Sequence, residues 1–196
     1  MKQSRVEAFT DAIVAIIMTI MILEFKTPET PSWTGILADV PYLFAYVVSF
    51  FFMAVAWYNH HYLFALLDRI TKRIYWVNNM WLLTMSMIPV ATAWTGRYIF
   101  ARGPEYFYLL VFFLWSLAFV WLSVEIRNVL RQSNPKAAEK IDQMATMRFM
   151  NGWKLPAFTL GLAIATYFFP PLCLVATLGE LIYMGLNTNA DADRVA

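Results

Sequence analysis

The chain has 196 residues, of which 60% are hydrophobic and only 14% charged, with a formal net charge of +2 and a mean hydropathy of +0.54. Soluble domains carry about 25% charged residues, so this composition excludes an ordinary soluble protein and predicts one transmembrane domain over residues 1–196. The small net charge argues against a nucleic-acid partner. The single cysteine, Cys173, forms no disulfide within the chain and has no second cysteine with which to share a metal.

Six apolar segments, each long enough to cross a bilayer or nearly so, follow one another along the chain. They lie at about 6–25, 42–67, 74–95, 106–127, 153–169 and 171–187. Pro89 predicts a kink in the third segment, and Pro170-Pro171 predicts a tight turn between the last two. The expected fold is therefore an all-α membrane protein with six transmembrane helices.

The first segment carries a charged pair, Arg5 and Asp11, at its start. A carboxylate placed inside a membrane span costs about 3 kcal/mol on insertion scales, and such a residue normally faces protein or water and has a partner. Because Glu7 and Asp11 interrupt the apolar run and no small-residue cleavage site follows, we expect a retained helix rather than a signal peptide.

A helical projection at 100° per residue divides this first helix into two faces. Four side chains lie within about 40° of Ile16, and Thr19 lies at about 60° from it. The four are Phe9, Ala12, Ile20 and Leu23. Thr10 and Asp11 point well away from that stripe. The aliphatic stripe taken by itself is typical of a surface that faces lipid or packs against another helix.

Polar side chains from the first three helices are expected at one depth in the membrane. They are Asp11, Asn59, His60, His61, Asn78 and Asn79. Buried polar groups need partners, so one interpretation is a structural clamp that holds the three helices together. The other is a proton relay or an ion site, because a histidine beside a carboxylate titrates near neutral pH. Adjacent histidines point about 100° apart on a helix, and we expect no metal site.

The basic residues are distributed unevenly between the two sides of the expected membrane domain. Twelve lysines and arginines, Arg194 among them, fall on the side of the amino terminus and three on the other, which predicts that both termini are cytoplasmic. On the same side, residues of about 133–150 follow a Ser133-Asn134-Pro135 start signal and alternate charged with apolar residues. This pattern predicts an amphipathic helix at the inner membrane face, either a connector or a regulatory element.

The start of the first helix resembles a known signature. Arg5, Phe9, Thr10 and Asp11 match the Arg-x-x-x-Phe-Ser-Asp pattern of the transmembrane-protein-175 family of potassium channels, with threonine in place of the usual serine. The segment Trp57-Tyr58-Asn59-His60-His61-Tyr62-Leu63-Phe64 is similar to the second helix of that family. The resemblance covers essentially the whole chain as one six-helix unit.

The resemblance implies a homotetramer in the bilayer of a prokaryotic plasma membrane, with the first helix of each subunit lining a central pore. Carried over to this chain, the pore positions are Ile16 as the hydrophobic constriction, then Thr19, with Ile20 and Leu23 toward the outside. Glu24 is expected either to concentrate cations in the outer vestibule or to be a solvated cap residue at the end of the helix. The chain has no Thr-Val-Gly-Tyr-Gly run, so no reentrant filter loop is expected. The expected function is a modestly selective, passive potassium conduction that caesium shares and that needs no cofactor.

The signature residues are then expected to act in assembly rather than in ion contact. This set comprises Arg5, Phe9, Thr10 and Asp11 together with His60, His61, Asn78 and Asn79. The alternative function is a secondary transporter with Asp11 and His60 or His61 as the coupling pair, and Glu125 or Glu180 as further sites. An enzyme is the weakest alternative, because the chain shows neither a nucleophile motif nor metal-ligand spacing.

Overall fold

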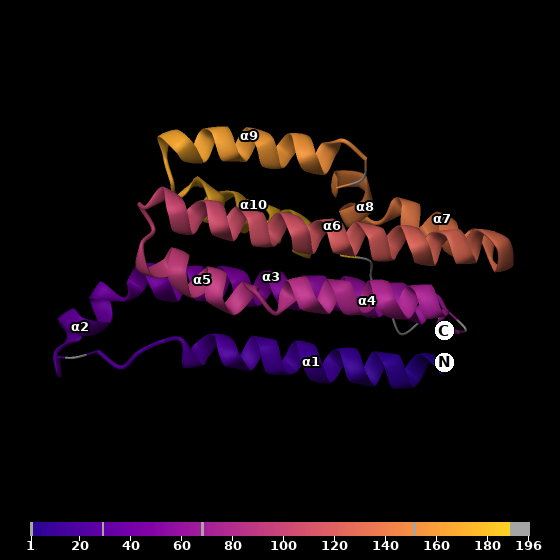
Figure 1. Ribbon diagram of the computed structural model, residues 1–196, viewed down its shortest axis with the longest axis horizontal. Coiled ribbons are helices and arrows are strands. Elements are labelled where there is room, and N and C mark those ends of the chain that lie inside the picture. Colours follow the sequence, from indigo (N-terminus) through magenta and orange to yellow (C-terminus); the bar gives the residue numbers. More distant parts are fainter. Residues whose placement is uncertain (1, 29, 68, 151, 189–196) are drawn as a thin grey trace.

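A computed structural model describes residues 2–28, 30–67, 69–150 and 152–188, and all regular structure in these ranges is helical (Figure 1). The helices are α1 (Gln3–Leu23), α2 (Trp33–Ala38), α3 (Val40–Ala65), α4 (Lys72–Met85), α5 (Ile88–Arg97), α6 (Arg102–Ser133), α7 (Pro135–Gln143), α8 (Ala145–Met150), α9 (Lys154–Phe168) and α10 (Leu172–Leu186). Three of them, α1, α3 and α6, are individually long and apolar enough to cross a membrane. The protein is thus an all-helical membrane protein.

The long helices lie nearly parallel in layers (Figure 1). Helix α1 forms one edge of the molecule and packs against α3, α4 and α5. Helices α6 and α10 cover the other side of this middle layer, and α9 lies outermost against them. The layering leaves one long side of α1 without a neighbour from its own chain.

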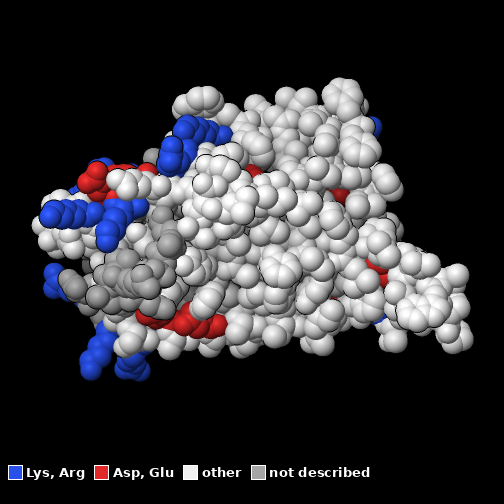
Figure 2. Space-filling view, turned by 180° about the vertical axis from the view of Figure 1, so that it is seen from behind, with Lys and Arg blue, Asp and Glu red and all other residues white. Residues whose placement is uncertain are grey.

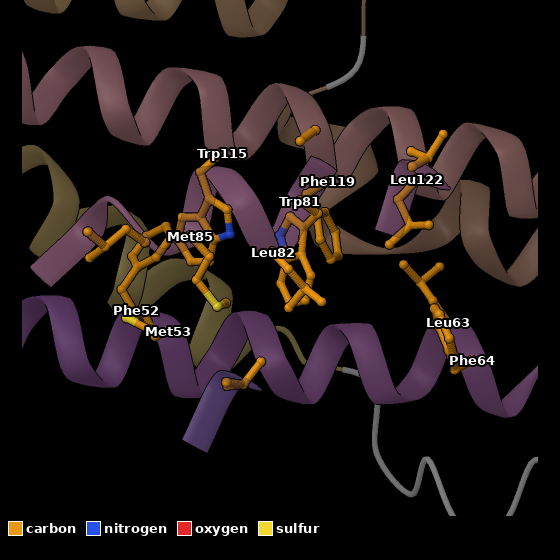
Figure 3. Close-up of a cluster of buried hydrophobic side chains, with 14 of the residues drawn as sticks. Phe52, Met53, Leu63, Phe64, Trp81, Leu82, Met85, Trp115, Phe119 and Leu122 are labelled. Atoms are coloured by element: carbon orange, nitrogen blue, oxygen red, sulfur yellow. The ribbon is translucent and has the colours of Figure 1, made fainter. Parts of the chain in front are cut away.

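The core lies between the middle layer and α6, where large side chains from three helices interdigitate (Figure 3). Its fully covered members include Leu63 and Phe64 of α3, Trp81 and Met85 of α4, and Leu122 of α6. The indole of Trp81 stacks on that of Trp115 with ring centroids 6.2 Å apart. Offset aromatic pairs of this kind add about 0.5–1.5 kcal/mol to the free energy of area burial.

The third predicted segment is divided rather than kinked. Helix α4 ends at Met85 and α5 begins at Ile88, so the helix breaks before Pro89 instead of bending at it. A proline ring clashes with the carbonyl group four residues earlier, which here belongs to Met85. The break therefore falls where the clash ends the first helix, and Pro89 occupies the first turn of the second. Similarly, α9 and α10 lie on either side of the Pro170-Pro171 pair.

The segment predicted as one amphipathic helix over 133–150 forms two, α7 and α8, separated at Met144. The side chain of Asn134 caps α7 by accepting a hydrogen bond from the backbone N–H of Ala137 at 3.2 Å, as the start signal predicts. The apolar side of this segment, including Ile141 and Met144, is buried within the protein, mainly against the extended end of α6. The apolar side of this segment therefore packs on the protein itself.

Charged side chains gather at one end of the molecule. Figure 2 shows most of the visible basic residues at the end where α1 begins, and a long pale surface beyond them. We call this the amino-terminal end. Arg194, which enters the predicted charge asymmetry, and the carboxyl terminus itself lie outside the described residues.

Candidate functional site: the exposed face of α1 and its anchors

Helix α1 has one buried and one exposed face. Val6, Thr10, Val14, Ile17 and Met21 are buried against the rest of the chain. The opposite face carries the aliphatic stripe, with Phe9 44%, Ile16 56%, Ile20 42% and Leu23 76% exposed. The two faces of the helical projection are therefore the buried and exposed faces of α1 in the folded chain.

Thr19 lies on the exposed face beside Ile16. Its hydroxyl donates within its own helix, with the carbonyl oxygens of Ala15 and Ile16 both 2.9 Å from Oγ1. Because the hydroxyl proton is directed to the backbone, the free lone pairs of Oγ1 are left to face outward. An oxygen so arranged can accept from water or contact a cation.

On the buried face, Thr10 begins a chain of hydrogen bonds across three helices. Its hydroxyl donates to the carbonyl oxygen of Val6 at 2.9 Å and accepts from Nδ2 of Asn78 at 2.8 Å. Oδ1 of Asn78 then lies 2.8 Å from Nε2 of His60. Since Oδ1 is an acceptor, Nε2 of His60 carries the proton. Thr10, Asn78 and His60 are all 0% exposed, so α1, α4 and α3 are joined inside the protein.

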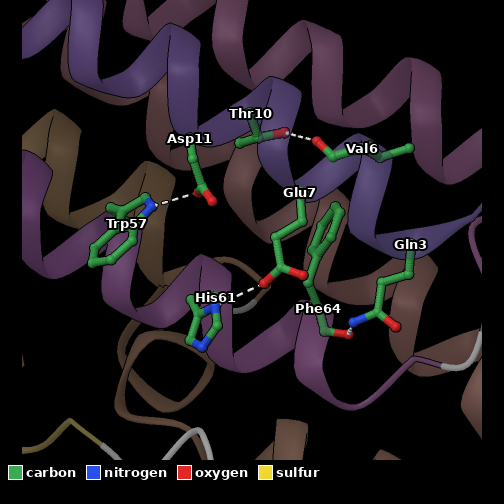
Figure 4. Close-up of polar contacts among 8 residues, drawn as sticks. All are labelled: Gln3, Val6, Glu7, Thr10, Asp11, Trp57, His61 and Phe64. Carbon is green, nitrogen blue, oxygen red and sulfur yellow. Dashed lines mark hydrogen bonds and ion pairs between the residues drawn. The ribbon is translucent and has the colours of Figure 1, made fainter.

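Three further bonds join the first turns of α1 to α3 (Figure 4). Oδ1 of Asp11 accepts from the indole Nε1 of Trp57 at 2.8 Å. Oε1 of Glu7 lies 2.7 Å from Nδ1 of His61. The amide of Gln3 donates to the backbone carbonyl of Phe64 at 2.7 Å. Residues 3–11 are thus bound to one side of α3 over two helical turns.

The expected polar cluster is therefore only partly assembled. The two histidines take different partners, Asn78 and Glu7, and Asp11 binds an indole that the sequence argument did not consider. Asn59 and Asn79 donate to carbonyl groups of their own helices, and neither bridges to α1 through these bonds. The predicted cluster rested on a common depth in the membrane. In the folded chain these side chains point in different directions from their helices and therefore take different partners.

The opposite end of α1 is also held by polar contacts. The hydroxyl of Tyr42 on α3 donates to the carbonyl oxygen of Met21 at 3.0 Å, and Nη2 of Arg97 on α5 donates to the carbonyl oxygen of Glu24 at 2.8 Å. The last carbonyl groups of a helix have no hydrogen-bond donors within that helix, and here the side chains of Tyr42 and Arg97 act as donors to two of them. Sequence reasoning missed both residues, although a tyrosine and an arginine near expected span ends are natural donors to such carbonyl groups.

In the part of the chain that the structure describes, no three side chains of histidine, cysteine, aspartate or glutamate lie close enough to hold a metal ion. The chemistry of α1 is instead divided by face. One face holds α1 against the rest of the chain, and the other exposes aliphatic groups and the hydroxyl of Thr19.

Comparison with known proteins gives a consistent result. The family model of the endosomal/lysosomal potassium channel TMEM175 matches residues 5–89. A protein named as a potassium channel from Chryseobacterium sp. is 34% identical over 171 residues, which cover 87% of this chain and 85% of the relative. A potassium channel of Streptomyces collinus is 29% identical over 194 residues, which cover 95% and 93%.

The fold also has a solved counterpart. The crystal structure of a lysosomal potassium-selective channel TMEM175 homolog from Chamaesiphon minutus superposes with a TM-score of 0.81 and 24% sequence identity, over 96% of this chain and 98% of the other. At this identity the superposition establishes a shared fold. Together with the extent of the match to the Chryseobacterium relative, it shows that the chain belongs to the TMEM175 family of potassium channels.

Proposed function

We propose that the protein is a passive, modestly potassium-selective cation channel in which four identical subunits surround a pore lined by α1. The observation that carries this proposal is the exposed stripe of α1, on a helix whose opposite face is bonded to the subunit. Six membrane crossings are proposed for each subunit: α1, α3, the α4–α5 pair, α6, α9 and α10. Both termini are then cytoplasmic, as the positive charges favour.

In this proposal Ile16 forms the constriction. Four isoleucine side chains around an axis make a dry collar that closes a pore by excluding water. Conduction requires that the collar widen enough to admit an ion with most of its hydration shell. Larger ions with weaker hydration lose water more easily, so potassium and caesium pass more readily than sodium.

The hydroxyl of Thr19 supports this selectivity. Its oxygen lies one helical turn beyond Ile16 on the exposed face, with its proton already donated to the backbone. It therefore offers lone pairs that replace part of the water an ion loses at the collar. Glu24, next along the chain beyond Leu23, is proposed to attract cations to the outer vestibule.

The direct test is the reversal potential of the purified protein in planar bilayers, with potassium on one side and sodium on the other. We expect a passive current that reverses at a potential set mainly by potassium. Uptake that saturates and is coupled to a second ion, without such a current, would contradict the proposal and favour a transporter.

Replacement of the constriction sharpens the test. We expect Ile16→Asn to raise the current and to reduce discrimination against sodium, because an amide wets the collar. Ile22→Asn is the matched control, since Ile22 is also exposed, at 43%, but lies about 120° around the helix from Ile16. Equal effects of both changes on the permeability ratio would remove Ile16 from this role.

The coupling pair required by a secondary transporter is not favoured by the contacts. Such a mechanism needs Asp11 to share a proton or ion with His60 or His61. Instead Asp11 accepts from Trp57, and each imidazole has another partner. Of the further sites, Glu125 is already paired with Arg73 at 2.6 Å.

A further inference from the structure

A groove of about 510 Å³ lies on the outside of the subunit between α4 and α6, near the amino-terminal end. It is lined by Lys72, Arg73, Trp76, Val77, Met80 and Trp121. The channel proposal uses none of these residues. Both indoles are exposed, Trp76 to 56% and Trp121 to 46%, although each is a large apolar group.

The charges in this groove are ordered with the cation outward. Nη2 of Arg73 lies 2.6 Å from Oε1 of Glu125, and the arginine side chain is 72% exposed while that of the glutamate is only 11% exposed. The indole Nε1 of Trp121 donates to the same carboxylate oxygen at 3.3 Å. The more buried carboxylate of Glu125 therefore holds the side chains of Arg73 and Trp121 in place. With Lys72 beside it, the accessible part of the groove is positive.

The lining changes in character along the groove. The cations lie in the first turn of α4, the two indoles follow, and Met80 and Leu83 continue the exposed side of α4 as purely apolar groups, 39% and 60% exposed. On α6, Leu117 continues from Trp121 in the same way and is 46% exposed. The groove thus presents first cations, then the amphipathic indole rings and then aliphatic side chains. A phospholipid presents matching groups in the same order, namely its phosphate, its glycerol backbone and its acyl chains.

We propose that this groove is a binding site for an anionic phospholipid from the leaflet at the amino-terminal end. Lys72 and Arg73 bind the phosphate and headgroup, the indoles of Trp76 and Trp121 flank the ester region, and an acyl chain follows Met80 toward the membrane centre. The complementary charge selects an anionic over a zwitterionic headgroup. This binding is independent of ion conduction and of the pore residues.

The test uses brominated lipids, which quench tryptophan fluorescence on contact. The full-length protein is placed in bilayers of equal parts phosphatidylglycerol and phosphatidylcholine. In one preparation only the phosphatidylglycerol chains carry bromine, and in the other only the phosphatidylcholine chains do. Bulk composition and surface charge are identical, so stronger quenching by the brominated phosphatidylglycerol measures enrichment of that lipid around the tryptophans.

Two sets of variants assign this enrichment to the groove. Trp76→Phe with Trp121→Phe removes the reporters, so the excess quenching is expected to fall. Lys72→Gln with Arg73→Gln and Glu125→Gln removes the outward cations without leaving a buried unpaired carboxylate, and is expected to lower the local enrichment about fivefold, as for one net basic charge. Lys72→Gln alone alters only an exposed side chain and is expected to act in the same direction.

Lys136→Gln is the matched control, because it removes one exposed positive charge on α7, outside the groove. It is expected to leave the excess quenching unchanged. Equal quenching by the two brominated lipids, or an equal loss in the control, would overturn the proposal. So would an absence of any change on removing the two tryptophans, which would mean that a neighbouring subunit covers the groove.

Discussion

Thr10 and Thr19 show how one residue type takes two roles on one helix. Both hydroxyls donate to carbonyl groups of their own helix, but Thr10 also accepts from Asn78 in the interior, whereas Thr19 is exposed. An unpaired donor in a site that excludes water costs free energy, while an exposed hydroxyl makes no such demand. Thr10 therefore contributes to the stability of the folded chain, and Thr19 to the proposed selectivity of the pore.

Thr10→Val is expected to lower stability by about 0.6–2 kcal/mol, because it leaves the Asn78 amide without its acceptor. Thermal unfolding of the purified protein in detergent measures this loss. Thr19→Val is the paired control and is expected to leave the unfolding midpoint in place while it weakens the preference for potassium. The same fall in midpoint for both variants would show that burial does not distinguish the two residues.

Asp11 is expected to matter for assembly through one acceptor oxygen rather than through its charge. Asp11→Ala removes the partner of Trp57 and is expected to reduce the yield of assembled protein before it changes ion preference. Asp11→Asn keeps a carbonyl oxygen at the same position and is expected to retain most of that yield. Size-exclusion chromatography compares the two variants. Well-assembled Asp11→Ala protein with altered selectivity would assign Asp11 to the pore.

At the scale of the element, α1 is a helix bonded at both ends and free of polar bonds to other helices between them. Thr10 and Asp11 are the last anchors at one end, and Met21 and Glu24 are the acceptors at the other. Between these positions the described side-chain bonds are those of Thr19 within its own helix. The stripe at Ile16 thus lies in the part of α1 that only apolar packing holds.

Removal of the anchors at the far end is expected to loosen that end alone. Tyr42→Phe combined with Arg97→Met deprives the carbonyl groups of Met21 and Glu24 of their donors. Hydrogen exchange should then speed up in the last turn of α1 and stay unchanged over residues 6–11. If exchange rises equally along the helix, the two ends are not independently anchored.

The sequence was sufficient for properties that depend on periodicity. The exposed face of α1 follows from a projection at 100° per residue, and the start of α7 follows from Asn134 and Pro135. It was insufficient to identify hydrogen-bond partners, because these depend on how the helices pack and on where each side chain points in the folded protein. The partners of His60 and His61 differ because neighbouring residues point to different helices, and no spacing rule identifies Trp57 as the donor to Asp11.

At the scale of the whole molecule, the other helices form a rigid support against which α1 packs. Helix α1 contains neither glycine nor proline, so it has no residue at which helices commonly bend. Bonds at both ends tie it to α3, and it packs on α4 and α5 as well. We therefore expect the proposed pore to widen by movement of whole subunits, or by rotation of the Ile16 side chain, rather than by bending of α1.

A hinge introduced between the anchors tests this expectation. Ala15→Gly lowers the stability of the helix by about 1 kcal/mol at an exposed position between the two sets of anchors. It is expected to raise the fraction of time that the channel is open in single-channel records. Ala8→Gly makes the same change on the exposed face within the anchored first turns and is expected to have little effect. If the two variants open equally often, the anchors do not restrain the helix.

The exposed stripe of α1 also predicts how the potassium conductance depends on the amount of protein in the membrane. A lone subunit presents Ile16 and Leu23 to lipid tails, where aliphatic groups carry no penalty, so it can persist in the bilayer without harm. In the proposed tetramer the constriction exists only where four copies meet. At low expression, leakage of potassium should then rise with the fourth power of subunit density, so a cell holding half the protein would retain about one sixteenth of the conductance.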